Sequence, residues 1–360
     1  MRMGINAALH SAREGYRQTG VSRYISELIS GLERVKGPDD ALMLFGHKTG
    51  PIKDNPLARI LWEQTGLPVN IAARRLDVFH TPIGAVPLLS TAPTVVTVHD
   101  IAFLKHPDQL PASRRTWLIG ATRMSARRAS KIITVSQATA NDLQEWLGIP
   151  DDRIQAIPLA ISGKVERVEG KSLEVFRMKW NIDRPYILAV GTLEPRKNLP
   201  TLLRAFARIK DDVDHQLVLV GPEGWLTGEL KNTLQELNLG DRVRLTGFIS
   251  DEELGGWYSG ADLFVFPSYY EGFGLPAIEA MRCGAPVLAS DNSAFPEVVG
   301  DAGVLIPADD TDLWADSMRD LLRDDTRRLH LRDLGFARAE AFSWDRTARE
   351  TYNIYKEVAS

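Results

Sequence analysis

The chain has 360 residues, a length typical of two domains that each bury a core of their own. Hydrophobic residues make up 44% and charged residues 25%, as in globular proteins, and no apolar run reaches the length of a membrane-spanning helix. The net charge of −4, without a basic stripe interleaved with aromatic residues, argues against a nucleic-acid partner.

The charge is unevenly divided between the two halves. Residues 1–170 carry 21 Lys and Arg against 16 Asp and Glu, whereas residues 171–360 carry 22 against 31. The positive first half indicates contact with something anionic, such as the inner face of a membrane. The first residues lead directly into a strand and lack the apolar segment of a secretory signal, and the one cysteine, Cys283, cannot form an internal disulfide. We therefore expect a cytoplasmic protein.

Apolar runs bounded by polar loops predict an alternation of strands and helices over the first half. The expected strands are residues 2–7, 41–45, 78–79, 94–98, 132–135 and 153–157. Helices are expected from Gly20 onwards, over 113–131, and after Ser136, whose side chain would cap the helix. Residues 48–76 and the loop 101–111 are expected to be irregular.

Two residues in this half lie where ligand contacts are typical. Gly20 precedes a helix N-terminus after the first strand, which favours anion binding, although such a glycine can equally well only turn the chain. His99 follows the strand 94–98, where a substrate would lie, or it is a hydrogen-bonded structural histidine. The six basic residues of helix 113–131 do not gather on one face, so a solvated surface is favoured over a membrane helix.

The polar segment 162–172, which contains two glycines, is typical of a linker, and the alternation then repeats. Strands are expected at 186–190, 216–220, 242–245, 263–266, 286–289 and 303–306. Helices are expected at 199–209, 228–237, 311–323, 326–341 and 344–357, with a further helix behind a capping box of Ser250 and Glu253. Two such alternations predict two doubly wound parallel sheets, one in residues 1–165 and one in residues 173–343.

The most informative stretch of the chain is LFVFPSYYEGFGLPAIEAMRCGAPVLAS, residues 263–290. A buried strand leads into a Gly-containing loop, and a proline then marks the first turn of a helix. Backbone N–H groups near Gly274 and Leu275 have no partner within the helix, so they form an anion site. Glu271 in the loop and Glu279 in the first helical turn offer acceptors for hydroxyl groups. A nucleotide joined to a sugar has both kinds of group.

The loop after strand 186–190 reads GTLEPRKN. In it, Arg196 and Lys197 stand just before a helix that Asn198 would cap. Two cations beside a helix N-terminus suit a diphosphate and the charge that builds on it as it leaves, although a solvated Arg-Lys pair would have the same sequence. This loop and the Glu271 loop both follow strand ends of one sheet, so they can converge on one ligand.

Neither a metal ion nor a cofactor is expected. Two Asp-x-Asp triplets, 212–214 and 310–312, have a spacing used for divalent ions, but a solvated turn and a helix cap are the favoured interpretations. The seven histidines show no zinc-ligand spacing, and there is no cysteine pair. The sequence contains no GxxxxGKS or GxxxxGKT loop and no GxGxxG after the first strand, which argues against a P-loop NTPase and a nicotinamide or flavin dehydrogenase.

Together, these segments resemble family 4 of the retaining glycosyltransferases, which have the GT-B fold of two facing Rossmann-like domains. The most specific match is EGFGLPAIEAM, residues 271–281, which fits the family's E-x7-E signature. Supporting matches are GVSRY (20–24), VHD (98–100), VS (135–136), GTLEPRKN (191–198) and FPEVV (295–299). The resemblance runs nearly end to end. It implies a cleft between the domains and a last helix, within 344–360, that packs back on the first domain.

The resemblance implies roles for residues on the donor side. Glu271 would hydrogen-bond hydroxyls of the donor sugar, and Glu279 would bind the ribose. The backbone from Phe273 through Gly274 to Leu275 would meet the phosphates or the sugar.

The resemblance also implies contacts with the diphosphate and the reacting carbon. Arg196 and Lys197 would bind the diphosphate, with Gly20 approaching it from the other domain. His99 would lie near the reacting sugar carbon as a positioning or electrostatic residue, not as the general base.

The sequence departs from the family at one phosphate contact. Many members have an arginine directly after the glycine at position 191, where this chain has Thr192, so Arg196 would take over that contact. Phe248 and Ile249 fall where the family usually contacts the nucleotide base. The forms GTLEPRKN and VHDIAFLKHP are most similar to mannosyltransferases of polysaccharide assembly, which favours GDP-mannose as donor over a UDP-sugar. The acceptor would be a glycan or a lipid-linked saccharide.

The reaction that the resemblance implies is hexose transfer to a hydroxyl with retention of the anomeric configuration. A front-face route, in which the departing phosphate helps to deprotonate the acceptor, fits the cation-rich corner best. Three alternatives stay open from the sequence. A GT-B epimerase would convert the donor alone, a phosphorylase would need a pyridoxal-type cofactor, and a non-catalytic nucleotide-binding partner subunit would bind donors without turnover.

Overall fold

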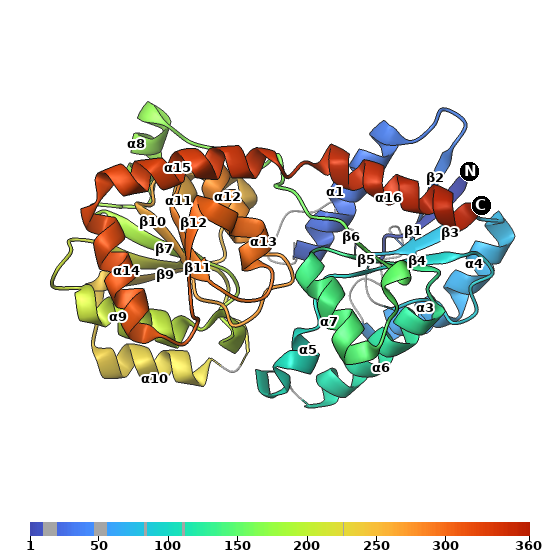
Figure 1. Ribbon diagram of the computed structural model, residues 1–360, viewed down its shortest axis with the longest axis horizontal. Coiled ribbons are helices and arrows are strands. Elements are labelled where there is room, and N and C mark those ends of the chain that lie inside the picture. Colours follow the sequence, from blue (N-terminus) through green and yellow to red (C-terminus); the bar gives the residue numbers. More distant parts are fainter. Residues whose placement is uncertain (10–19, 47–55, 83–84, 110–111, 226) are drawn as a thin grey trace. The chain divides into compact units, whose positions relative to one another are not determined.

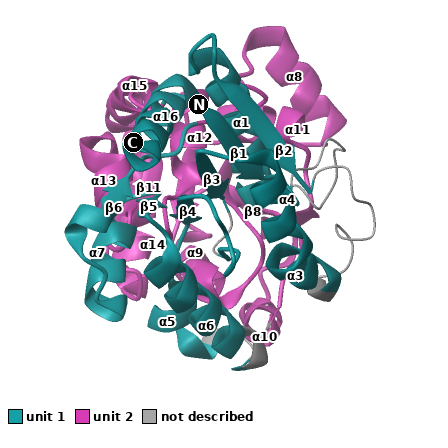
Figure 2. Ribbon diagram, turned by 90° about the vertical axis from the view of Figure 1, so that its right-hand side faces the viewer, with its two compact units in different colours: residues 1–160, 343–360 teal, residues 161–342 magenta. Residues whose placement is uncertain are grey.

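The computed structural model describes residues 1–9, 20–46, 56–82, 85–109, 112–225 and 227–360. The chain divides into two units (Figure 2). Unit 1 comprises Met1–Ala160 and Ser343–Ser360, and unit 2 comprises Ile161–Phe342. Each unit is an α/β domain around one six-stranded parallel sheet, so the expected pair of doubly wound sheets is confirmed.

The sheet of unit 1 has the strand order β2-β1-β3-β4-β5-β6 (Figure 1). Its strands are β1 (Arg2–Asn6), β2 (Ala41–Phe45), β3 (Val78–Thr81), β4 (Thr94–Val98), β5 (Lys131–Thr134) and β6 (Ile154–Ala156). Neighbouring strands run parallel; Met3, for example, lies opposite Leu42 on one side and Val78 on the other. The strands β3 and β4 are buried along their whole length because helices cover both faces of the sheet.

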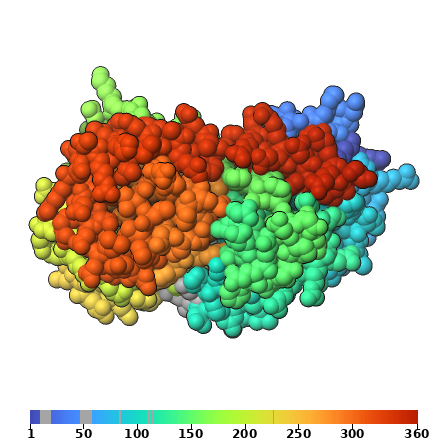
Figure 3. Space-filling view, in the orientation of Figure 1, coloured from blue at the N-terminus to red at the C-terminus, as the bar shows by residue number. Residues whose placement is uncertain are grey.

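The helices of unit 1 are α1 (Gly20–Val35), α3 (Pro56–Gln64), α4 (Gly66–Arg74), α5 (Ala102–Lys105), α6 (Ala112–Arg128), α7 (Gln137–Leu147) and α16 (Trp344–Ala359). The helices α1 and α16 cover one face of the sheet, and α3 to α7 cover the other (Figure 2). In the space-filling view, α16 forms a dark red band on the surface of unit 1 (Figure 3). Side chains of β4 alternate between these faces: Val96 and Val98 join the core beneath α6 and α7, and Thr97 points the other way.

The expectation that residues 48–76 are irregular is wrong for the part that the structure describes, which contains α3 and α4. Their inward residues, among them Leu67 and Ile71, pack against Phe79 of the sheet. Exposed apolar residues on the outer sides of these helices, Leu61 and Val69, obscure the apolar spacing in the sequence. Residues 47–55 lie outside the described residues. The loop 101–111 likewise contains the short helix α5.

The sheet of unit 2 has the strand order β12-β11-β10-β7-β8-β9. Its strands are β7 (Tyr186–Val190), β8 (Gln216–Val220), β9 (Val243–Gly247), β10 (Leu263–Phe266), β11 (Val287–Ser290) and β12 (Gly303–Ile306). Its helices are α8 (Gly170–Lys179), α9 (Leu199–Ile209), α10 (Gly228–Leu237), α11 (Asp251–Ser259), α12 (Leu275–Cys283), α13 (Phe295–Val299), α14 (Thr311–Arg323) and α15 (Asp325–Glu340). The core on one face joins α9, α10 and α14 to the strands, with Phe206 and Trp314 fully buried. Within the described ranges, no helix combines the length and apolar character needed to cross a membrane.

The segment 162–172 is not a free linker. Val165 is fully buried, the Val168 N–H donates to Ser259 Oγ at 2.9 Å, and α8 already begins at Gly170. The segment therefore packs against α11 as part of unit 2, which begins at Ile161 and not at residue 173.

The capping box expected at Ser250 is not formed. The helix α11 does begin after Ser250, but the serine side chain makes no capping bond. Glu253 pairs instead with Lys179 of α8 at 2.5 Å, which takes its carboxylate away from the helix N-terminus.

Candidate functional site

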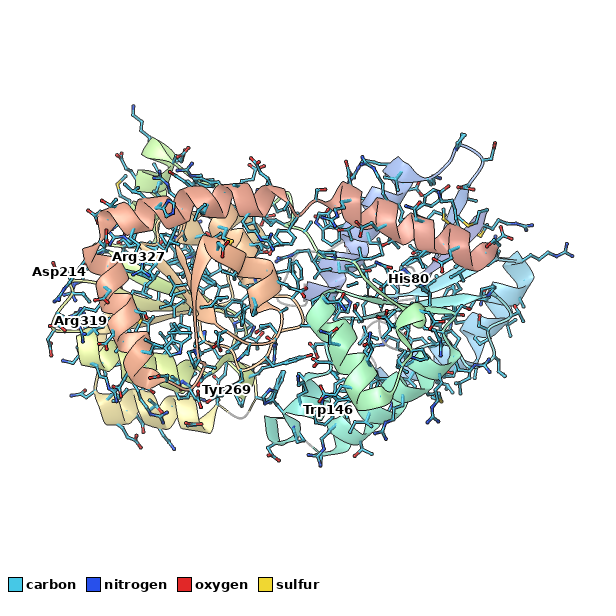
Figure 4. The ribbon with its side chains drawn as sticks, viewed as in Figure 1. His80, Trp146, Asp214, Tyr269, Arg319 and Arg327 are labelled. Atoms are coloured by element: carbon cyan, nitrogen blue, oxygen red, sulfur yellow. The ribbon has the colours of Figure 1, made fainter. Side chains whose placement is uncertain are left out.

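A cluster of charged side chains in unit 2 lies where β7 and β10 end. These strands pair in the middle of the sheet, with Leu263 opposite Ile187, so the loops after them start side by side. The loop after β7 contains the short 3₁₀ helix η3 (Pro195–Lys197), and the loop after β10 leads into α12. The N–H of Tyr269, labelled in Figure 4, donates to the Arg196 carbonyl at 2.9 Å and ties the two loops together.

The ammonium group of Lys197 lies inside the unit. Its Nζ is 2.6 Å from Glu271 Oε1 and 4.9 Å from the centroid of the Phe266 ring, and 8% of the residue is exposed. Burial lowers the pKa of Lys197, and the Glu271 carboxylate opposes this shift. The alternative of a solvated Arg-Lys pair is therefore wrong for Lys197.

Arg196 is held by three protein groups. Its Nε and Nη2 donate to Glu194 Oε1 at 3.0 and 2.8 Å, and Nη1 donates to the Tyr270 carbonyl at 2.7 Å. Nη1 also lies 2.7 Å from Glu271 Oε2. Sequence reasoning missed Glu194, although its place just before the proline turn that carries both cations is a local signal. Every nitrogen of the guanidinium thus has a protein partner.

Glu271 joins both cations in one cluster. One carboxylate oxygen receives Lys197 and the other receives Arg196, while its backbone N–H donates to Ser293 Oγ at 3.0 Å. Burial alone would raise the pKa of Glu271, but the charges and hydrogen bonds of the two cations outweigh it and hold the pKa at about 2. We call the four residues Glu194, Arg196, Lys197 and Glu271 the charged corner. Its two positive and two negative charges cancel.

Asn198 does not cap α9 with its side chain, contrary to the prediction. The residue occupies the N-cap position with a φ of 51°, and its Nδ2 donates to the Ala308 carbonyl at 2.6 Å. The amide therefore joins the loop of the charged corner to the segment after β12.

The start of α12 has the geometry of an anion site. Gly274 occupies the N-cap with a φ of 98°, a left-handed conformation that glycine adopts without strain. The helix begins at Leu275, and the Ala277 N–H donates to the Gly274 carbonyl at 2.9 Å. The amides of Gly274 and Leu275 stand at the positive end of the helix dipole. Phe273, which precedes them, is 4% exposed and packs edge-on against Phe342.

Glu279 lies deeper in α12 than expected. It is the fifth residue of the helix, beyond its first turn, and it is 2% exposed. Tyr258 of α11 donates its hydroxyl to Glu279 Oε2 at 3.0 Å. Tyr258 was not identified from the sequence, because it is far from Glu279 along the chain and only the packing of α11 on α12 brings them together.

The other donor-side candidates follow the strands β7 and β9. Thr192 is half-buried after β7 and packs against Gly224. Phe248 is 43% exposed after β9, and Ile249 is buried. For the described residues, the structure gives no bond from these three to the charged corner.

Gly20 and His99 belong to unit 1. Gly20 is the exposed first residue of α1. His99 follows β4, is half-buried, and places Nε2 3.0 Å from the Pro82 carbonyl. Because a carbonyl only accepts, Nε2 carries the hydrogen and Nδ1 is left as an acceptor. Burial lowers the pKa of His99, so the imidazole is neutral near pH 7.

The Asp-x-Asp triplets are occupied by other contacts. Asp310 caps α14 by accepting from the Leu313 N–H at 2.9 Å, as expected, and Asp212 pairs with Arg319 at 2.9 Å. Over the described part of the chain, no group of three or more His, Cys, Asp or Glu side chains could hold a metal ion.

Two protein families match most of the chain between them. Residues 172–336 match the family described as glycosyl transferases group 1, and residues 19–162 match glycosyltransferase family 4. The boundary between the two matches falls at the start of unit 2.

Several curated relatives carry mannosyltransferase names, and others are D-inositol 3-phosphate glycosyltransferases. O-antigen chain mannosyltransferase B of Escherichia coli is 35% identical over 73% of this chain and 70% of its own length. The MMP α-(1→4)-mannosyltransferase of Mycolicibacterium hassiacum is 32% identical over 74% of this chain and 66% of its own length. The serotype-specific mannosyltransferase WbdA of Escherichia coli is 30% identical, but the match spans 61% of this chain and only 28% of WbdA.

Solved structures match the fold over nearly the whole chain. Sucrose-phosphate synthase from Thermosynechococcus elongatus superimposes with a TM-score of 0.79 at 24% identity, over 99% of this chain and 98% of its own. HepE from Anabaena, solved in complex with UDP and glucose, superimposes with a TM-score of 0.77 at 19% identity, over 99% and 100%. Family, relatives and fold agree, and the chain is a glycosyltransferase of family 4 with the GT-B fold.

Proposed function

We propose that this enzyme transfers a mannosyl residue from a nucleotide-diphosphate donor, GDP-mannose in preference to a UDP-sugar, to a hydroxyl of a glycan or lipid-linked saccharide. The names of the relatives support mannose and polysaccharide assembly. The observation that carries the proposal is the charged corner beside the N-terminus of α12, where Lys197 and Arg196 meet Glu271.

The proposed reaction is a front-face displacement with retention. The bond between the anomeric carbon and the diphosphate oxygen breaks, and its electron pair stays on the diphosphate. The acceptor oxygen then bonds to the anomeric carbon on the same face, and its proton passes to the departing phosphate. Lys197 and Arg196, with the amides of Gly274 and Leu275, would stabilise the charge that grows on the diphosphate.

The diphosphate would take over contacts with Arg196 and Lys197 that the carboxylates of the charged corner make in this structure. Arg196 already binds Glu194 and Glu271, so a phosphate oxygen would compete with these two carboxylates for the guanidinium. Release of Glu271 from Arg196 would free a carboxylate oxygen for a sugar hydroxyl, which is the role that the resemblance gives to this residue. Glu279 would bind the ribose, and the backbone at Phe273 would meet the phosphates or the sugar.

The remaining roles follow from the family resemblance. Phe248 and Ile249 would contact the base. Because Thr192 stands where many family members have an arginine, Arg196 would make that phosphate contact. Gly20 and His99 of unit 1 would contact the diphosphate and the sugar. A neutral His99 with Nδ1 as acceptor suits a positioning or electrostatic role, not proton abstraction.

A peripheral membrane contact of unit 1 is part of the proposal, because lipid-linked acceptors lie at membranes. The helix α6 lacks a clean apolar face, so the contact would be electrostatic: the helix contains no acidic residue, and its exposed positions include Arg123 and Arg127. Co-sedimentation with vesicles containing anionic lipid tests this point. Binding should weaken in Arg123→Glu with Arg127→Glu; equal binding of this variant would remove the contact from the proposal.

The donor is tested by thermal unfolding with GDP-mannose, GDP, UDP-glucose and UDP. A ligand at 100 times its Kd stabilises a protein by about 2.7 kcal/mol, which is easily measured. GDP-mannose and GDP should raise Tm more than the uridine compounds. A larger rise with UDP would show that the donor is a UDP-sugar and not GDP-mannose. No rise with any of the four compounds would overturn the proposal. Donor incubated without acceptor should give slow hydrolysis and no epimer, which separates this reaction from that of an epimerase.

A further inference from the structure

A chain of buried hydrogen bonds crosses one face of the unit 1 sheet. Tyr24 of α1 shares a bond with Thr97 of β4 at 3.0 Å, and Thr97 lies 2.8 Å from Nε2 of His80 in β3. His80 Nδ1 lies 2.5 Å from the hydroxyl of Tyr355 in α16. All four residues are buried, Tyr24 at 2% exposure and the other three at 0%. In Figure 4 the label of His80 lies beneath α16.

The sequence places these residues on one face through strand alternation. Phe79 and Val96 point to the face under α4 and α6, so their neighbours His80 and Thr97 point to the face under α1 and α16. Burial lowers the pKa of His80 to about 3, so the ring is neutral and can donate with one nitrogen and accept with the other. A polar chain inside an apolar core is costly unless each member has its partner, and every member here has one.

The chain ends at a residue of the candidate site. The Tyr24 ring packs edge-on against the His99 imidazole, with centroids 4.9 Å apart and planes at 86°. The centroid of the Tyr24 ring also lies 6.0 Å from that of Trp344, the first residue of α16. The His99 ring is therefore held by two contacts, the Pro82 carbonyl at Nε2 and the ring of Tyr24.

We propose that Tyr24 is a positioning residue for His99, and that the bonds through Thr97 and His80 to Tyr355 let the C-terminal helix α16 fix the orientation of the imidazole. The proposal rests on the role of His99 in the proposed function. It does not need Tyr24 to touch a substrate. A ring locked by its hydroxyl cannot rotate away, so Nδ1 of His99 stays aimed in one direction.

The test compares four single variants by kcat, donor KM and Tm. Tyr24→Phe and Tyr355→Phe each remove one hydroxyl of the chain and should lower kcat about threefold, and Tyr24→Leu should lower it about tenfold, with donor KM within twofold in each case. Tyr352→Phe is the matched control, because Tyr352 also lies on α16 but its hydroxyl bonds Asp40 and not the chain. Its kcat should stay at the wild-type value even where its Tm falls.

A measurement independent of turnover is the NMR signal of the His99 imidazole in protein labelled with ¹⁵N-histidine. The seven histidines are few enough to assign, and His99→Ala identifies the signal by its loss. Tyr24→Leu should shift this signal because it removes a ring current, and Tyr355→Phe should shift it more weakly. Unchanged His99 signals in both variants would overturn the proposal whatever the kinetics show.

Double variants separate this inference from the proposed function. On the His99→Ala background, Tyr24→Leu should cause no further loss of kcat, because the residue acts through His99. A further tenfold loss there would contradict the positioning role. If His99→Ala itself keeps full kcat while the NMR shift is present, the proposed role of His99 fails and the structural coupling stands.

Discussion

The ammonium of Lys197 lies 2.6 Å from Glu271 Oε1, although the two residues are separated by 74 positions in the sequence. Both side chains are buried, so water cannot take the place of the partner of either charge. Removing one partner would leave an uncompensated charge in an apolar setting, which usually costs about 3 to 5 kcal/mol. Removing either side chain alone should therefore destabilise unit 2 as well as disturb the proposed donor site.

The first prediction concerns acid stability. The folded-state pKa of Glu271 is about 2, whereas an unperturbed glutamate titrates at 4.5. Because the folded pKa is depressed, its contribution to stability is full above about pH 4.5 and is lost as the pH falls towards 2. Urea denaturation from pH 7 to pH 3 should show a steeper decline for wild type than for Glu271→Gln. Parallel declines would show that the ion pairs do not set this pKa.

The second prediction separates two effects of Glu194: it holds the Arg196 guanidinium in place, and its negative charge opposes the binding of a diphosphate. Glu194→Gln removes a negative charge beside the proposed diphosphate site, so GDP should bind as tightly as in wild type or more tightly. The guanidinium loses its charged anchor, so kcat should fall about tenfold. Calorimetry and steady-state kinetics measure the two effects. Glu229→Gln is the control, since Glu229 pairs with Arg204 outside the charged corner; weaker GDP binding in Glu194→Gln alone would contradict the prediction.

The third prediction assigns donor affinity to Glu279. Glu279→Gln weakens the acceptor that we propose for the ribose hydroxyls, so donor KM and the Kd of GDP should rise about tenfold while kcat changes less than threefold. Tyr258→Phe tests the supporting bond at 3.0 Å and should raise KM by a smaller factor. A loss confined to kcat in Glu279→Gln would place this residue at the reacting carbon and not at the ribose.

Much of unit 2 could be predicted from local sequence. The bounds of β7, β8, β12, α9, α10 and α14 agree with the expected ranges, because each is an apolar or amphipathic run that ends at glycine, proline or a polar turn. The sequence predicted that the loops of Lys197 and Glu271 lie together, since each follows a strand of one parallel sheet, but not that the two side chains pair with each other.

The missed features depend on tertiary contacts. Tyr258 meets Glu279, and Ser293 meets the Glu271 amide, through packing that no local pattern reveals. The helices α3 and α4 were missed because apolar residues also lie on their outer sides, where Leu61 and Val69 are 65% and 69% exposed, so the sequence shows no clean one-sided apolar spacing. The side chain of Asn198 was assigned to the nearest helix, but a carbonyl more than a hundred residues away binds it.

The fourth prediction concerns the backbone that supports the charged corner. Gly221 follows β8 with a φ of 145°, and a Cβ there would lie 2.0 Å from the Gly191 carbonyl oxygen. Gly191 is itself close to Lys197, whose Cε would be 3.0 Å from a Cβ at position 191. Gly221→Ala must therefore push the β7 loop away and displace Lys197 from Glu271. We expect a loss of about 2 to 4 kcal/mol in the free energy of unfolding and a fall in kcat of at least tenfold.

Gly228→Ala is the matched control for this substitution. Gly228 begins α10, and nothing lies within 4 Å of an added Cβ. Alanine should be neutral there or stabilise by about 0.5 kcal/mol through the smaller entropy of the unfolded chain. Chemical denaturation and kcat of both variants measure the contrast. If Gly221→Ala matched Gly228→Ala in both, the close approach of the β7 and β8 loops would not be what places Lys197 beside Glu271.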